Sequence, residues 1–92
     1  YILDTLGWVL FKQGKLSEAI KYLEAAYSIA PKVAIIAEHL GDVYVKQAMI
    51  EKAKKMYEKA METETEAAKL DKIRVKITAI EVDTNRAPAT AP

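Results

Sequence analysis

The sequence predicts an all-α protein: an α-solenoid of two tandem helical hairpins followed by a C-terminal capping helix. Three observations support this prediction. The chain repeats itself with a period of 34 residues, its composition favours helices, and its last apolar stripe has helical spacing. Of 92 residues, 51% are hydrophobic and 29% charged, with three glycines and three prolines. Alanine and straight-chain residues lose little entropy in a helix.

The repeat appears when the chain is compared with itself at an offset of 34 residues. Ten of the 31 pairs formed by residues 1–31 with residues 35–65 are identical. They are Ile2–Ile36, Leu6–Leu40, Gly7–Gly41, Val9–Val43, Lys12–Lys46, Gln13–Gln47, Ala19–Ala53, Lys21–Lys55, Glu24–Glu58 and Ala26–Ala60. A period of this length is typical of two antiparallel helices joined by a turn.

Breakers and caps place the helices at about 1–13, 17–30, 34–47 and 50–63. Gly14 is expected to end the first helix in the left-handed conformation, and Pro31 to stop the second. Ser17 is the predicted N-cap of the second helix. Ala48 stands where a glycine stands in the first hairpin, so the second turn is predicted to be strained or differently built.

Two glycines, Gly7 and Gly41, lie inside predicted helices, where glycine costs about 1 kcal/mol relative to alanine. Such a residue is expected where another helix approaches closely. Small residues recur on the second helix of each hairpin at Ala19, Ala26, Ala53 and Ala60, which agrees with close packing.

The first copy, LDTLGWVLFKQGKLSEAIKYLEAAYSIAP, resembles the tetratricopeptide repeat. The resemblance covers residues 1 to about 65 and divides the chain into repeats at 1–33 and 34–66. It rests on Leu3, Leu6, Gly7, Leu10, Ala19, Leu23, Ala26 and Pro31 in the first copy, and on Ala37, Leu40, Gly41, Tyr44, Ala53, Tyr57 and Ala60 in the second. The segments DTLGWVL and AEHLGDVY resemble repeats of bacterial multi-repeat proteins. We therefore expect this chain to be the C-terminal part of a longer array.

The family pattern stops after residue 65, because Val75 takes the position of the repeat glycine. Leu70, Ile73, Ile77 and Ile80 nevertheless recur at helical spacing, which predicts a capping helix at 67–83. A fused helix from 50 to 82 is the alternative. Met61 and Leu70 would then face opposite sides of one straight helix, which favours a break near 63–66. Residues 84–92 are Pro- and Ala-rich and predict a disordered tail.

Composition removes several functional classes. The chain has no cysteine and a net charge of +1, without a one-sided basic surface for nucleic acid. No apolar run is long enough to span a membrane. His39 is the only histidine, and the Glu38–Asp42 pair is expected on a solvated face rather than in acid–base chemistry. We therefore predict no enzyme, cofactor, metal or catalytic residue, and the sequence predicts no compartment.

The resemblance implies that the first helix of each repeat lines a concave groove that binds a protein or peptide. Carried over by position, the groove residues are Asp4, Trp8, Phe11, Lys12, Ile35, Glu38, Asp42, Val45 and Lys46. Acids at Asp4, Glu38 and Asp42 would repel a carboxylate, so a chaperone-tail clamp is not expected. A ligand with an apolar anchor and a basic group fits these positions.

Two other functions are open at this point. The chain could be a structural module that forms homodimers through the C-terminal helix or an exposed repeat face. It could also be a regulatory domain attached to an enzyme. The groove chemistry of the family varies on a constant scaffold, so the fold alone does not identify the partner.

Overall fold

The computed structural model describes the backbone of residues 2–89 and the side chains of residues 2–83. This part of the chain forms five α-helices and no strand: α1 (Ile2–Lys12), α2 (Leu16–Ile29), α3 (Ala34–Lys46), α4 (Ile50–Thr63) and α5 (Ala67–Ala89). The predicted all-α architecture is confirmed.

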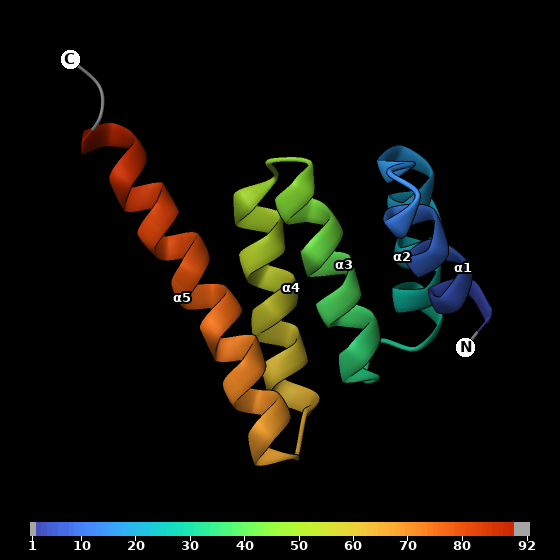
Figure 1. Ribbon diagram of the computed structural model, residues 1–92. Helices are drawn as coiled ribbons and strands as arrows, with labels where there is room; N and C mark the ends of the chain where they lie inside the picture. The colour runs from blue at the N-terminus through green and yellow to red at the C-terminus, as the bar shows by residue number, and fades with distance from the viewer. Residues whose placement is uncertain (1, 90–92) are drawn as a thin grey trace.

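The helices form a layered array in which each packs against the next along the chain (Figure 1). α1 with α2 and α3 with α4 form the two hairpins, and α5 packs along α4. The array measures 46 × 31 × 18 Å, an elongated slab rather than a sphere. Sequential packing of this kind is the arrangement of a repeat solenoid.

The helix glycines mark the closest approaches inside the hairpins. A Cβ at Gly7 would lie 2.6 Å from Leu23 Cγ, and one at Gly41 would lie 2.6 Å from Tyr57 Cε1. Both facing side chains are buried. The sequence argument that these glycines admit a neighbouring helix is therefore confirmed.

The two hairpin turns have the same backbone conformation despite their different residues. Gly14 has φ 80° and Ala48 has φ 60°. Alanine is strained in this region because its Cβ crowds the following carbonyl. The second turn is thus built like the first one, and the predicted strain lies at Ala48.

The N-cap assigned to Ser17 is wrong. α2 begins at Leu16 with Lys15 as its N-cap residue, and no side chain caps it. The left-handed Gly14 turns the chain so that the Lys15 carbonyl already accepts the first helical hydrogen bond, from Ala19 N at 3.0 Å. Ser17 therefore lies inside the first turn.

The break between α4 and α5 falls at residues 64–66, as the phase argument predicted. Glu64 is extended, with φ −78° and ψ 134°. Its carboxylate accepts hydrogen bonds from the backbone N–H groups of Thr65 and Glu66, at 3.1 and 3.0 Å. The redirected α5 then buries Ile73 and Ile80 against the core.

α5 continues to Ala89, so the predicted disordered tail is wrong for residues 84–89. The chain has no glycine or proline between Ala67 and Ala87, and nothing in that stretch stops a helix before Pro88. Residues 90–92 of the predicted tail lie outside the described residues.

Candidate partner-binding groove

The predicted groove residues lie on α1 and α3, which contact each other across the hairpin boundary. Asp4 on α1 is 7% exposed and accepts a hydrogen bond from Nδ1 of His39 on α3, at 2.8 Å. Burial of a carboxylate is tolerated when it is hydrogen-bonded. Asp4 is therefore a structural contact between the hairpins more than an exposed acid of the groove.

A stack of rings extends from this contact along α1. Trp8 lies parallel to the His39 imidazole, with ring centroids 4.0 Å apart and an interplanar angle of 19°. Phe11 follows at 4.9 Å from Trp8. The ammonium of Lys12 lies 4.9 Å from the Trp8 ring and 5.8 Å from the Phe11 ring, within cation–π range. We call Trp8, Phe11, Lys12 and His39 the ring cluster; Trp8 and Phe11 are half-buried.

A second cluster joins α3 to α5 and is called the acidic cluster below. Its members are Glu38, Asp42, Tyr57 and Lys76. The Lys76 ammonium donates to Glu38 at 2.6 Å and to Asp42 at 3.1 Å. The Tyr57 hydroxyl also donates to Asp42, at 2.5 Å. The expectation of a solvated face for the Glu38–Asp42 pair is wrong: Glu38 is buried, at 9% exposed, and Asp42 is half-buried, because α5 places the Lys76 ammonium between the two acids.

The titration behaviour of these groups follows from the same contacts. Burial lowers the pKa of Lys76, but the hydrogen bond to Glu38 and the charge of Asp42 outweigh it, so the pKa is raised overall. Burial, followed by the hydrogen bond to Asp42, raises the pKa of the Tyr57 hydroxyl. Lys76 is thus charged and Tyr57 neutral at physiological pH.

The other predicted groove positions differ in exposure. Ile35 is 45% exposed, Val45 is half-buried and Lys46 is exposed. Lys46 follows Asp42 by one helical turn, as Lys12 follows Trp8, and residues four apart are neighbours on a helix surface. The groove positions of α3 therefore run from Ile35 to Lys46 along one side of the helix.

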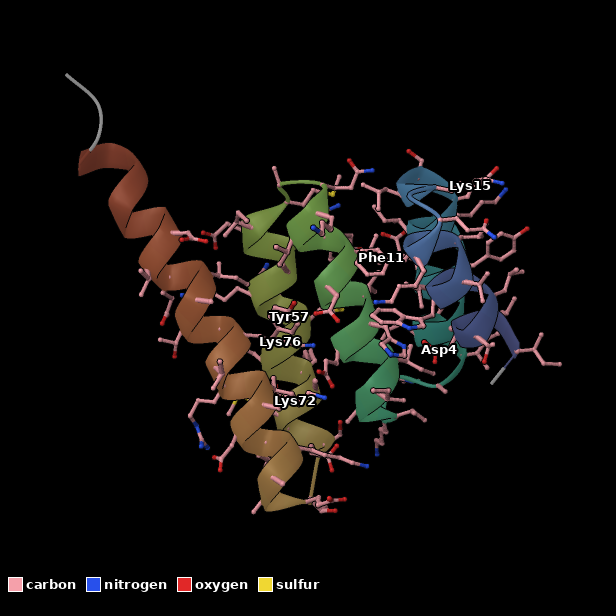
Figure 2. The ribbon with its side chains drawn as sticks, viewed as in Figure 1. Asp4, Phe11, Lys15, Tyr57, Lys72 and Lys76 are labelled. Atoms are coloured by element: carbon pink, nitrogen blue, oxygen red, sulfur yellow. The ribbon has the colours of Figure 1, made fainter. Side chains whose placement is uncertain are left out.

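Sequence reasoning missed three members of this surface: His39, Lys72 and Lys76. Figure 2 shows Lys72, Lys76 and Tyr57 gathered at the α4–α5 side, with Asp4 and Phe11 at the α1 side. The signal for the two lysines was the 34-residue register, because they follow Glu38 and Asp42 by one period. α5 thus supplies side chains where a third repeat would, although it lacks the repeat glycine.

The described side chains offer no other chemistry at this surface. They contain no group of three or more His, Cys, Asp or Glu residues placed to hold a metal ion. No helix within residues 2–89 is both long and apolar enough to cross a membrane. The arrangement consists of half-buried rings and fixed charges, which suit contact with another chain.

Fold and surface together define a protein of tandem helical hairpins whose first helices form one face. The model of the tetratricopeptide repeat-like domain matches residues 5–82, and the chain belongs to this family. A TPR repeat-containing protein of Pseudomonas aeruginosa is 44% identical over 41 residues, which are 45% of this chain. The match spans 7% of that relative's length. Family membership supports a general role as a scaffold for protein interaction.

Proposed function

We propose that the chain binds a peptide segment of another protein along the face formed by α1, α3 and α5, and that it is not an enzyme. The observation that supports this most directly is the ring cluster. Trp8 and Phe11 are half-buried beside fixed charges, and aromatic side chains of this kind are the usual anchors of interfaces. Such a surface can bury an apolar side chain of a partner.

The acidic cluster favours a partner that carries a basic group. Two carboxylates share one ammonium, so Glu38, Asp42 and Lys76 together keep a negative charge. Lys72, one turn before Lys76 on α5, is exposed and opposes an incoming cation. Free carboxylate tails would be repelled by the same acids, which argues against a chaperone-tail receptor.

The test uses Trp8, the only tryptophan of the chain, as an intrinsic fluorescent reporter. A displayed library of random twelve-residue peptides is selected against the protein, and the selected peptides are titrated while Trp8 emission is recorded. We expect a saturable change in emission. Ile35→Ala should weaken binding, while Ile29→Ala, an equally large truncation at an exposed site on α2, should not. Failure to select any peptide that perturbs Trp8 would refute groove binding.

A second candidate function, self-association through an exposed repeat face, is favoured by one specific comparison. Ile2, Leu6 and Val9 on α1 are 85%, 39% and 45% exposed. The residues one period later are Ile36, Leu40 and Val43, which are 0%, 2% and 0% exposed. α3 packs against α2, whereas the described chain has no helix in the equivalent position over α1.

This alternative predicts a dimer at high concentration. Mass measured by light scattering after size exclusion should rise with concentration for the natural chain and stay monomeric for Leu6→Glu. A monomer at every concentration would refute self-association and would leave the groove-binding hypothesis unaffected.

A further inference from the structure

The acids and the lysines of the groove differ in what they contact. Asp4 is bonded to His39, and Glu38 and Asp42 are bonded to Lys76. Lys12 and Lys46 are exposed, and within residues 2–83 neither forms an ion pair. The exposed charges in the last turns of α1 and α3, at one end of the groove, are therefore positive.

The two lysines are equivalent by the repeat register and occupy the last turns of α1 and α3. Contacting helices lie about 8–10 Å apart, so their ammonium groups can reach one carboxylate between them. The acids of the acidic cluster precede Lys46 on α3. Asp42 lies one turn before Lys46, about 6 Å along the helix axis, and Glu38 lies two turns before it, about 12 Å away.

The contact of Lys12 with the rings is compatible with this use. An ammonium has three donors and no acceptor, and its contact with Trp8 and Phe11 occupies only one side of it. A carboxylate can therefore bind Lys12 while the cation–π contact persists. The same ammonium then borders both the apolar anchor and the acidic group of a partner.

From this placement we infer that the charge of the groove changes along its helices and that Lys12 and Lys46 bind an acidic side chain of the partner. We call this arrangement the polarised groove. This inference rests on the proposed groove function. The bound segment presents a carboxylate to the two lysines and an apolar side chain beside Trp8 and Phe11, while Glu38 and Asp42 stay paired with Lys76.

The experiment takes the peptides selected from the twelve-residue library and compares their charges. We expect an enriched Asp or Glu close to an apolar residue that lies beside Trp8 and Phe11. Replacing that acid by glutamine should weaken binding about two- to fivefold, the range of an exposed ion pair. The effect should shrink as salt is raised from 0.05 to about 0.5 M.

The decisive variant is Lys12→Glu/Lys46→Glu, read by Trp8 emission. Its matched control is Lys21→Glu/Lys55→Glu, which makes the same charge change at equivalent, exposed positions of α2 and α4. The groove variant should lose the peptides and favour versions in which the acid is replaced by lysine, while the control should bind as the natural chain does.

The possible outcomes distinguish failure of the polarised groove from failure of the proposed groove binding. Selected peptides without an enriched acid, or equal losses in the groove and control variants, would overturn the polarised groove while leaving groove binding intact. Failure to obtain any peptide that perturbs Trp8 would overturn both. Circular dichroism of both double variants establishes that they are folded before binding is compared.

Discussion

Replacing Gly41 by alanine should destabilise the protein, although alanine is the better helix former. The gain in helix propensity is about 1 kcal/mol. Against it, the new Cβ would lie 2.6, 2.7 and 3.0 Å from Cε1, Cδ1 and Cζ of Tyr57. Tyr57 is 2% exposed and its hydroxyl is bonded to Asp42. The ring cannot move aside without breaking that bond.

The magnitude follows from these terms. Overpacking a core costs about 1–3 kcal/mol, and losing a hydrogen bond to a charged group costs about 1.5–3 kcal/mol. After the propensity gain is subtracted, the expected net loss is about 1.5–5 kcal/mol. For a domain of this size that corresponds to a fall in Tm of roughly 6–40 °C.

The assay is urea unfolding followed by circular dichroism at the helix band. Ala25→Gly, at an exposed position within α2, calibrates the propensity term in the same protein. A double-mutant cycle of Gly41→Ala with Tyr57→Ala should show that the two losses are far from additive, because the smaller side chain removes the clash. An increase of stability by Gly41→Ala would refute the close approach of α3 and α4.

Three further predictions concern a turn, an ion pair and pH. Ala48→Gly should stabilise the protein by about 0.5–1 kcal/mol in urea unfolding, because relief of the positive φ exceeds the entropy that glycine adds to the unfolded chain. Lys76→Met should cost about 1–3 kcal/mol in the same assay, less than a fully buried pair, because its side chain is 29% exposed. The folded state raises the pKa of Lys76, Tyr44 and Tyr57, so stability should hold below about pH 10 and fall above it, as the unfolded chain loses these protons first. A scan of Tm from pH 8 to 11 checks this, and Tyr57→Phe should flatten the fall.

The fold was largely predictable because the repeat shows each structural position in two copies. Gly7 and Gly41 share a register position, and both proved to be points of close approach. The change of phase between Met61 and Leu70 predicted the break at 64–66. These features follow from local spacing, which a single sequence shows directly.

The site was less predictable because its contacts join residues far apart in the chain. Asp4 and His39 are 35 residues apart, and Glu38 and Lys76 are 38 apart. The sequence placed Glu38 and Asp42 in the groove, and the 34-residue register pointed to Lys76 on the last helix. The missing repeat glycine at Val75 obscured that signal, so the lysine between the two acids was not predicted.

The central claim, that the face of α1, α3 and α5 binds a partner peptide, is tested most directly by amide chemical shifts of the ¹⁵N-labelled protein during titration with a selected peptide. We expect shifts concentrated at Trp8, Lys12, Ile35 and Lys46, with little change at Lys21 and Lys55 on the second helices. Shifts concentrated on α2 and α4 instead would place binding on the opposite side of the hairpins and contradict groove binding.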